Sequence, residues 1–316
     1  MVTRLLILTP AVAFNEQLRS ALVRIFPDLT IHIAANAGAA MPLIDGTGGL
    51  LTIGSAVTDE LLQAARELTW IQSLGTGVDG IVDRPMLAPH IAVTNARGLF
   101  DDAVSECALA LMLALTRDLP QLVRNQAARR WEFWTPRLLS GKCVGVVGLG
   151  AIGTTLAHKC KALGMRVIGI SSRPHAPSVD AIFSYDGLID VASRLDFLVL
   201  AAALTAQNRG LINSRVLSAM RPSCYLVNVA RGAMVVEEDL IEALKSGTIA
   251  GAALDAFIQE PLSEDSLLWS APNLLISPHL AGPNDTNLER VLRIIEQNIR
   301  AMQRADRGAL INVVPR

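Results

Sequence analysis

The stretch from Cys143 to Gly153 constrains the fold most strongly, because it joins an apolar strand to a helix through spaced glycines. It reads CVGVVGLGAIG and contains the pattern G-x-G-x-x-G. In a dinucleotide-binding unit these glycines permit a tight turn, a close approach of the backbone to a pyrophosphate, and close packing of helix on strand. The N–H groups at the helix start then bind phosphate oxygens. The predicted cofactor contacts are Gly148, Gly150, Ala151, Ile152 and Gly153.

The strand expected next, at 166–170, bears on which dinucleotide binds. An NAD site usually ends this strand with an acidic residue that accepts a hydrogen bond from the ribose 2′-hydroxyl. Here the chain continues Ser171-Ser172-Arg173, and no Asp or Glu lies between Gly148 and Val179. Hydroxyl groups and a guanidinium would bind a 2′-phosphate. We therefore predict that NADP(H) is preferred; NAD(H) stays possible, because Arg173 could equally be a solvated loop residue.

Short apolar runs alternate with helix-like segments on both sides of this motif, which indicates parallel βα units. A single core seldom grows beyond roughly 250–300 residues, so 316 residues predict two domains. We expect two Rossmann-like, doubly wound α/β domains. The expected strands are 5–8, 30–34, 50–53, 70–73, 91–95, 143–147, 166–170, 196–201, 224–228, 250–254 and 274–277. The main expected helices are 14–26, 38–45, 58–67, 101–117, 154–163 and 285–304.

Composition argues against several partner classes. A formal net charge of −1 and an aromatic content of 4% give no electrostatic or stacking reason to expect nucleic acid or anionic lipid. The longest later apolar run, 107–115, is far short of the ~20 residues of a membrane span. The cysteines are scattered without a C-x-x-C motif, so we expect reduced structural thiols, no metal site and a cytoplasmic protein. They are Cys107, Cys143, Cys160 and Cys224.

Three later segments each place polar side chains directly after an apolar strand. They are LVNVARG, LDAFIQEP and ISPHLAG, ending at Gly232, Pro261 and Gly282. The carboxyl ends of parallel strands meet at one edge of a doubly wound sheet, where ligands bind. The side chains expected to converge there are Arg231, Asp255, Glu260 and His279.

An arginine, a glutamate and a histidine in this arrangement suit the reduction of a 2-keto acid. The planar guanidinium of Arg231 can bind the neighbouring carboxylate and carbonyl oxygens together. His279 can give a proton to the carbonyl oxygen as negative charge builds there. Glu260 beside it would orient the ring and raise the histidine pKa. We therefore predict hydride transfer between a nicotinamide dinucleotide and a small 2-keto or 2-hydroxy acid.

The motifs GLGAIG, NVARG, DAFIQEP and SPHLAG, in this order, resemble those of the D-isomer-specific 2-hydroxyacid dehydrogenase family, especially its glyoxylate/hydroxypyruvate reductase branch. The resemblance implies that Arg231 binds substrate, that His279 is the general acid/base and that Glu260 is its partner. It also implies cofactor contacts at Val229, Ala230 and Asp255, the last near the nicotinamide. The implied domains are a flavodoxin-like substrate domain at 1–98 and 283–316 and a dinucleotide-binding domain at 99–282.

The resemblance extends to two further features. The loop after residue 73 resembles the family's carboxylate-binding loop, with the N–H groups of Thr76 and Gly77 as donors, although its glycines could also mark an ordinary tight turn. The segment 129–136 resembles the arm that embraces a second subunit, which implies a homodimer. Trp134 in this arm could approach the partner's active site and limit substrate size, or lie only in the dimer interface.

Some positions depart from the family pattern, and other readings stay open. Residues 200–205 lack the usual His or Cys and Pro, and Arg97 replaces a usual Pro. Glu260 argues against formate dehydrogenase relatives, which pair the histidine with Gln, whereas phosphite- and 3-phosphoglycerate-oxidising relatives remain possible. The alternatives to a glyoxylate- or hydroxypyruvate-like substrate are a bulkier keto acid, or a dinucleotide-sensing interaction protein on the same fold.

Overall fold

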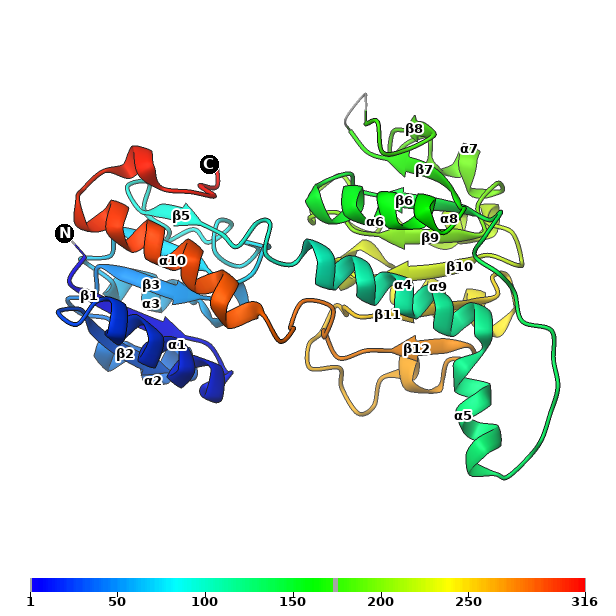
Figure 1. The fold of residues 1–316 in the computed structure, drawn as a ribbon, viewed down its shortest axis with the longest axis horizontal. Helices are drawn as coiled ribbons and strands as arrows, with labels where there is room; N and C mark the ends of the chain where they lie inside the picture. The colour runs from blue at the N-terminus through cyan, green and yellow to red at the C-terminus, as the bar shows by residue number, and fades with distance from the viewer. Residues whose placement is uncertain (1, 173–175, 316) are drawn as a thin grey trace. The chain divides into compact units, whose positions relative to one another are not determined.

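The computed structural model describes residues 2–172 and 176–315, so Arg173 lies outside the described residues. The chain divides into two compact units, Met1–Phe100 with Asn284–Arg316, and Asp101–Pro283. Each unit is a parallel β-sheet with helices on its faces (Figure 1). The prediction of two doubly wound α/β domains is confirmed.

The first unit has a five-stranded sheet in the order β2-β1-β3-β4-β5, with every pair parallel. This is the flavodoxin-like order. Its strands are β1 (Arg4–Leu8), β2 (Thr30–Ala34), β3 (Gly49–Thr52), β4 (Trp70–Ser73) and β5 (Ala92–Thr94). Its helices are α1 (Val12–Ile25), α2 (Ala37–Ala40), α3 (Asp59–Ala64) and α10 (Asn287–Gln303), with short 3-10 turns at Met41–Leu43, Gly54–Ala56 and Arg307–Ala309.

Alternating side chains of β1 divide the core of this unit into two layers, as a period of two requires. Leu5 and Ile7 pack in the layer that holds residues of α1 and α10, whereas Leu6 and Leu8 pack in the layer that holds residues of α2 and α3. Helix α10 contributes the fully buried Ile295, whose burial stabilises the fold by roughly 1.5–3 kcal/mol. A segment from the far end of the chain thus completes the first unit.

The second unit has a seven-stranded parallel sheet in the order β12-β11-β10-β9-β6-β7-β8. From β8 to β11 this is the Rossmann order, with β12 added at the edge. The strands are β6 (Cys143–Val147), β7 (Arg166–Ile170), β8 (Ala181–Phe183), β9 (Phe197–Leu200), β10 (Tyr225–Asn228), β11 (Gly251–Leu254) and β12 (Leu274–Ile276).

Helices cover both faces of this sheet. Helices α7, α8 and α9 pack side by side and bury their apolar residues in one core with the strands, while α4 and α6 pack against each other. The helices are α4 (Asp101–Arg117), α5 (Leu119–Ala127), α6 (Ala151–Ala162), α7 (Leu188–Ala192), α8 (Ser214–Ala219) and α9 (Glu237–Lys245), with 3-10 turns at Gly232–Met234 and Leu267–Ser270.

Sequence reasoning missed two elements of the second unit. Strand β8 is only three residues long and half-buried, so it carries little apolar signal. Helix α5 lies in a stretch for which the sequence predicted no helix. It begins after Asp118, whose carboxylate accepts a hydrogen bond from the Gln121 N–H at 3.3 Å, and Pro120 lies in its first turn. A capping Asp and an early Pro are a helix-start signal.

Candidate active site

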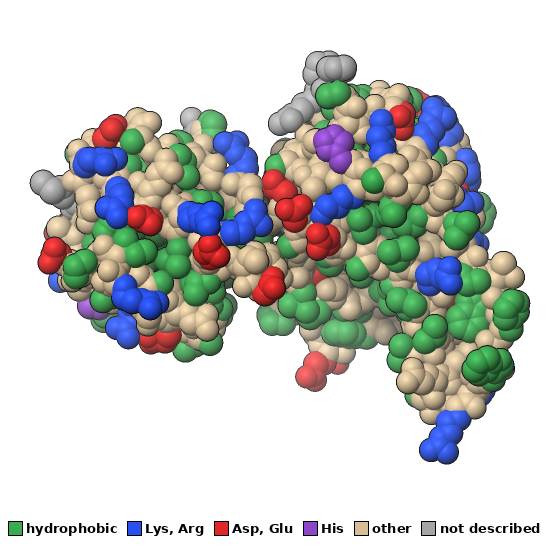
Figure 2. All heavy atoms as spheres, in the orientation of Figure 1, with side chains coloured by type: hydrophobic (Ala, Val, Ile, Leu, Met, Phe, Trp, Pro, Cys, Tyr) green, Lys and Arg blue, Asp and Glu red, His purple; other side chains and the backbone are tan. Residues whose placement is uncertain are grey.

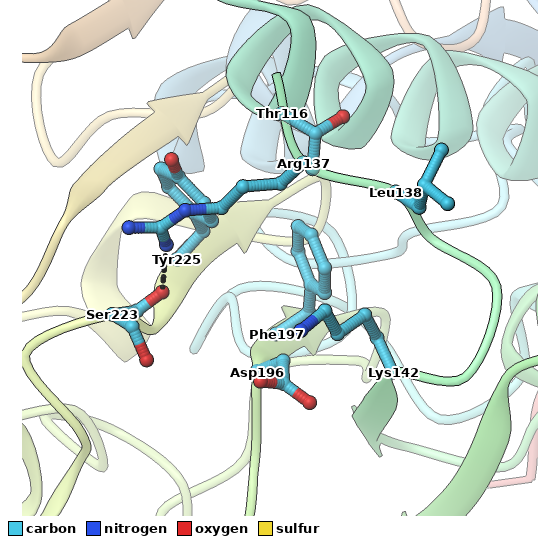
Figure 3. A pocket seen from close by; sticks show the side chains of 8 residues that line it. All are labelled: Thr116, Arg137, Leu138, Lys142, Asp196, Phe197, Ser223 and Tyr225. Carbon is cyan, nitrogen blue, oxygen red and sulfur yellow. Dashed lines mark hydrogen bonds between the residues drawn. The ribbon is translucent and has the colours of Figure 1, made fainter. Parts of the chain in front are cut away.

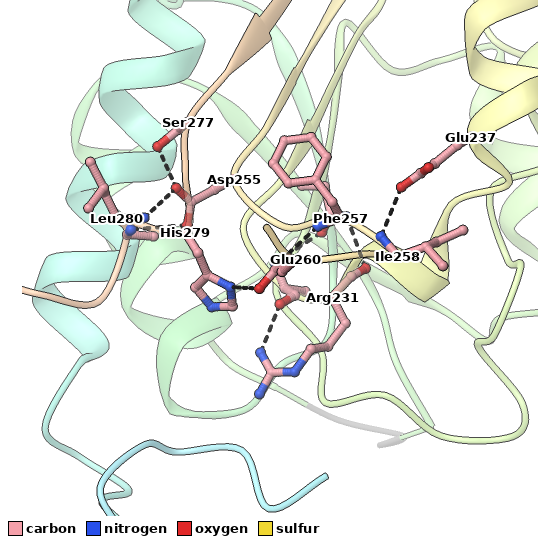
Figure 4. Close-up of polar contacts among 12 residues, drawn as sticks. Arg231, Glu237, Asp255, Phe257, Ile258, Glu260, Ser277, His279 and Leu280 are labelled. Carbon is pink, nitrogen blue, oxygen red and sulfur yellow. Dashed lines mark hydrogen bonds and ion pairs between the residues drawn. The ribbon is translucent and has the colours of Figure 1, made fainter. Parts of the chain in front are cut away.

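Three neighbouring strands of the second unit deliver the predicted catalytic residues. Strand β11 pairs with β10 on one side and β12 on the other, and their last residues align. Because these strands are parallel, the loops that follow them emerge at the same edge of the sheet. They bring together Arg231 after β10, Asp255 and Glu260 after β11, and His279 after β12 (Figure 4).

Glu260 and His279 form a hydrogen-bonded pair. Nδ1 of His279 lies 2.8 Å from Oε2 of Glu260, and Oε1 of the same carboxylate accepts a hydrogen bond from the Phe257 N–H at 2.9 Å. The hydrogen bond to Glu260 raises the pKa of His279; partial burial and the charge of Arg231 oppose this shift, while the charges of Glu260 and Asp255 support it. Burial opposes ionisation of Glu260, but its hydrogen bonds from His279 and Phe257, with the nearby positive charges, hold its pKa below the usual value.

The side chain of Asn228 holds the turn that carries Arg231. Asn228 accepts a hydrogen bond from the Ala230 N–H and donates one to the Arg231 carbonyl, both at 3.0 Å. The guanidinium of Arg231 donates to the Ala230 carbonyl at 2.8 Å. Its charge acts on both members of the Glu260–His279 pair, so the three side chains form one electrostatic cluster.

Gly232 brings the loops after β10 and β11 into direct contact. A Cβ atom at this position would lie 1.9 Å from the carbonyl carbon of Phe257 and 2.3 Å from the nitrogen of Ile258. Any larger residue would push the two backbones apart. The arginine turn therefore packs against the peptide that leads to Glu260.

Asp255 holds the loop that carries His279. Its buried carboxylate accepts hydrogen bonds from the Ser277 hydroxyl at 2.5 Å, the Leu280 N–H at 2.8 Å and the Ala281 N–H at 3.0 Å. Between these bonds, His279 has a φ of +55°, in the left-handed region that non-glycine residues seldom occupy. The carboxylate thus fixes a backbone conformation that is costly for histidine.

The glycine-rich loop between β6 and α6 has the geometry of a phosphate cradle. Gly148 has a φ of +91°, and its Cβ would lie 2.6 Å from Ala202. A Cβ at Gly153 would lie 1.8 Å from the Gly148 carbonyl oxygen, whereas a Cβ at Gly150 would meet no atom of the described residues within 4 Å. Gly150 is exposed and is the N-cap residue of α6, where it has no side chain with which to cap the helix. The open space and the helix N-terminus fit the pyrophosphate of a dinucleotide.

The other predicted cofactor residues follow strands β7 and β10 at the same edge of this sheet. Ser171 follows β7 and is buried, with its N–H donating to the Phe183 carbonyl at 2.9 Å, and Ser172 is exposed. Val229 and Ala230 are buried in the arginine turn. Ala202, in the segment that departs from the family pattern, packs on Gly148, so that segment borders the glycine loop.

Thr76 and Gly77 lie in the first unit, in the loop after β4. Carbonyl groups of this loop face inward, because Ser73 donates to the Gly77 carbonyl at 2.8 Å and Asn95 donates to the Thr76 carbonyl at 2.8 Å. Within residues 2–172 and 176–315, the Thr76 and Gly77 N–H groups have no acceptor, and the buried Thr76 hydroxyl has no partner. Two free N–H groups and a hydroxyl on one turn suit an anion.

An apolar segment extends from the second unit at α5 and the residues that follow it. Figure 2 shows hydrophobic side chains gathered over this region. Trp131 is 102% exposed and Phe133 is 94% exposed. The Trp134 indole N–H is buried and has no hydrogen-bond partner among the described residues. This segment, 119–138, is called the arm below.

A cavity of about 150 Å³ marks where the arm rejoins the sheet, at the amino ends of β6, β9 and β10 (Figure 3). Arg137 lines it and donates to the Ser223 carbonyl at 2.8 Å, with its guanidinium 5.5 Å from the Tyr225 ring centre. Asp196 accepts a hydrogen bond from the Cys143 N–H at 2.9 Å. These contacts stabilise the fold, and those of Arg137 anchor the arm to the sheet. The cavity lies at the amino ends of the strands, opposite the carboxyl ends that carry His279.

Other site classes find no support in the described part of the chain. Its helices include none that is long and apolar enough to cross a membrane, and its His, Cys, Asp and Glu side chains form no metal-binding group. Burial raises the pKa of Cys160 and Cys224 to about 12, and burial with the charge of Asp255 raises that of Cys107 to about 11. These thiols are poor nucleophiles at neutral pH.

Sequence reasoning did not identify Ser277 or Glu237 as neighbours of the site. Ser277 bonds Asp255, and Glu237 accepts a hydrogen bond from the Ile258 N–H at 2.9 Å. Ser277 stands two residues before His279, so its place in ISPHLAG was the available signal. Glu237 lies 21 positions from Ile258, and no sequence motif links the two residues.

Comparison with known proteins identifies the family. The family model described as D-isomer specific 2-hydroxyacid dehydrogenase, NAD binding domain, matches residues 109–281, more than half of the chain. The chain belongs to the D-isomer-specific 2-hydroxyacid dehydrogenase family. Its members are oxidoreductases that act on CH–OH groups with NAD or NADP, so this 2-hydroxyacid dehydrogenase is an enzyme of that class.

Individual relatives agree with this identification. A glyoxylate/hydroxypyruvate reductase from Arabidopsis thaliana is 32% identical over 249 residues, which make up 78% of this chain and 76% of that protein. A family member from Aeromonas salmonicida has a TM-score of 0.87 at 31% identity and covers 100% of this chain and 99% of its own. Another, from Xanthobacter autotrophicus in complex with NADPH and MES, has a TM-score of 0.83 at 29% identity and covers 100% and 98%.

Proposed function

We propose that this 2-hydroxyacid dehydrogenase is an NADP(H)-dependent reductase that converts a small 2-keto acid, of the glyoxylate or hydroxypyruvate kind, to the D-2-hydroxy acid. The observation that carries the proposal is the 2.8 Å contact between His279 and Glu260 in the same loop cluster as Arg231. The Arabidopsis relative is named a glyoxylate/hydroxypyruvate reductase, which supports this substrate class.

Each member of the cluster has a defined task in this reaction. Arg231 binds the substrate and polarises its carbonyl group. His279, in its protonated form, gives a proton to the carbonyl oxygen, and Glu260 keeps the ring oriented and charged. The reduced nicotinamide, when bound, supplies the hydride that the carbonyl carbon accepts. The π bond of the carbonyl group breaks as one C–H and one O–H bond form, so the substrate gains a hydride at carbon and a proton at oxygen, in total two electrons and two protons.

Thr76 and Gly77 are proposed to bind the substrate carboxylate through their N–H groups. The absence of another acceptor for these groups within residues 2–172 and 176–315 supports this role. Val229, Ala230 and Asp255 are proposed to line the cofactor site. Asp255 keeps capacity for one more hydrogen bond, because a carboxylate offers about four acceptor positions and three are in use.

NADP(H) is proposed as the preferred cofactor. Ser171, Ser172 and Arg173 would bind the 2′-phosphate, and no Asp or Glu lies between Gly148 and Val179 to repel it. The Xanthobacter relative was crystallised with NADPH. The kcat/KM values for NADPH and NADH test this directly, and a clear preference for NADH would refute it. Replacing Arg173 by Ala should raise the KM for NADPH while the KM for NADH stays unchanged.

The enzyme is proposed to act as a homodimer in which the arm embraces a second copy. Exposed Trp131 and Phe133 give the arm an apolar surface, and Arg137 anchors its end to the sheet. Trp134, from the same segment, would approach the partner's site and limit substrate size. Replacing Trp134 by Ala should then change the order of preference among 2-keto acids. An unchanged order would mean that Trp134 contributes only to the dimer interface and does not limit substrate size.

The main test is NADPH oxidation with a panel of 2-keto acids from glyoxylate to aromatic pyruvates. The expected result is turnover of the smallest members, abolished by His279→Ala. Preference for bulky members would refute the substrate class. A protein that binds NADPH but turns over no member would instead be a dinucleotide-sensing protein on this fold.

A further inference from the structure

We infer that Glu237 is a positioning residue, which holds the peptide before Glu260 against the arginine turn and so fixes the Glu260–His279 pair. This inference rests on the proposed function of that pair. Glu237 belongs to α9 and lies outside the strand-end motifs that supply the catalytic side chains. It acts on the reaction only through the loop after β11.

The contact is specific to this loop. Oε1 of Glu237 accepts a hydrogen bond from the Ile258 N–H at 2.9 Å, and Oε1 of Glu260 accepts one from the preceding N–H, that of Phe257, also at 2.9 Å (Figure 4). Two glutamates therefore hold two consecutive N–H groups. Glu260 is the partner of His279, and Glu237 belongs to helix α9.

Gly232 packs against the same peptide, which joins Phe257 to Ile258. Its backbone lies so close to the Phe257–Ile258 peptide that even a methyl group would not fit. The Ile258 side chain is 58% exposed and cannot anchor the loop by packing. Glu237 supplies the anchor instead, because α9 is itself fixed in the core through buried residues such as Leu240 and Leu244.

A simpler role for Glu237 would be to stabilise the N-terminus of α9. Acidic residues in a first helical turn interact favourably with the helix dipole. Glu238 and Asp239 occupy the same turn, and Asp239 accepts a hydrogen bond from the Ser214 N–H at 2.7 Å. Glu238 is exposed and contributes charge at the same helix end, and within the described residues it makes no hydrogen bond or ion pair with the catalytic loop. It is therefore the matched control.

Three variants separate these roles: Glu237→Ala, Glu237→Gln and Glu238→Ala. Glu237→Ala should lower kcat/KM for the keto acid about tenfold, the size of one hydrogen bond to a charged acceptor. It should leave the KM for NADPH unchanged. Glu237→Gln keeps an oxygen that can accept from Ile258, so it should restore most of the activity although it lacks the charge. Glu238→Ala should behave like the wild type.

Titration of His279 by NMR gives a readout that needs no substrate, with His279→Ala assigning its signal among five histidines. The charged groups that act on this imidazole are Glu260, Arg231 and Asp255. If Glu237 positions Glu260, the His279 pKa falls in Glu237→Ala and recovers in Glu237→Gln. An unchanged pKa in Glu237→Ala, or equal losses of activity in Glu237→Ala and Glu238→Ala, would overturn the inference. If no keto acid is turned over but the His279 pKa still falls in Glu237→Ala, the proposed function is refuted and the positioning role of Glu237 stands.

Discussion

Nδ1 of His279 lies 2.8 Å from Oε2 of Glu260, and this one contact shifts the acid–base behaviour of both residues. The pKa of the histidine rises and that of the glutamate falls. The pair therefore stays as imidazolium and carboxylate over a wider pH range than either side chain would alone. That is the state from which a carbonyl oxygen can take a proton.

The first prediction concerns pH. Reduction requires the protonated histidine, so kcat/KM for the keto acid should fall as pH rises through the raised pKa of His279. Glu260→Gln removes the anionic partner, lowers this pKa and should move the falling limb to lower pH. Oxidation of the hydroxy acid requires the neutral histidine, so its rising limb should move in the same direction. Rate profiles measured in both directions check this, and an unmoved limb in Glu260→Gln would contradict it.

The second prediction separates cofactor binding from folding in the glycine loop. Gly150→Ala should change stability by no more than about 0.5 kcal/mol, because its Cβ would meet no atom of residues 2–172 and 176–315 within 4 Å. It should still weaken NADPH binding, because the methyl group fills the proposed phosphate space. Gly153→Ala should lower stability by roughly 1–3 kcal/mol, because its Cβ would collide with the Gly148 carbonyl oxygen. Urea unfolding and NADPH titration measure both; equal loss of stability in the two variants would contradict the assignment.

The third prediction concerns the loop that carries His279. Asp255→Ala removes the acceptor of the Leu280 and Ala281 N–H groups as well as that of Ser277. It should cost ~3 kcal/mol of unfolding free energy and reduce kcat, because the left-handed conformation of His279 loses its support. Ser277→Ala removes one of the three bonds and should have a smaller effect on both. Denaturant unfolding and initial rates are the measurements, and a larger loss in Ser277→Ala would show that Asp255 is not the anchor.

The fourth prediction concerns the arm. A double variant, Trp131→Ser with Phe133→Ser, should shift a dimer towards monomer, because it removes two side chains that are exposed in the single chain. The control is Leu267→Ser, which changes an apolar side chain that is 63% exposed in the same unit but outside the arm. Sedimentation velocity over a range of concentrations measures the change. Dimers of equal strength in both variants would place the interface elsewhere.

Much of this architecture could be predicted because its signals are local. The strand–glycine–helix motif at Gly148 and the apolar runs predicted both parallel sheets, and strand ends predicted where Arg231 and His279 would meet. Helix α5 was missed because the polar residues after it hid the signal at Asp118. The contact of Glu237 with Ile258 was not predictable, because it depends on how closely the Gly232 turn approaches another loop.

The close approach at Gly232 also has a consequence for the engineering of this enzyme. The loops after β10 and β11 are in contact through their backbones, so an insertion or deletion in one loop would displace the other. Libraries aimed at new substrates should therefore leave residues 228–234 and 255–261 intact, together with 277–282, whose loop the Asp255 carboxylate holds. Diversity is better placed in the arm, where Trp131 and Phe133 are exposed and Trp134 is proposed to limit substrate size, so that the substrate can change while Arg231, Glu260 and His279 keep their geometry.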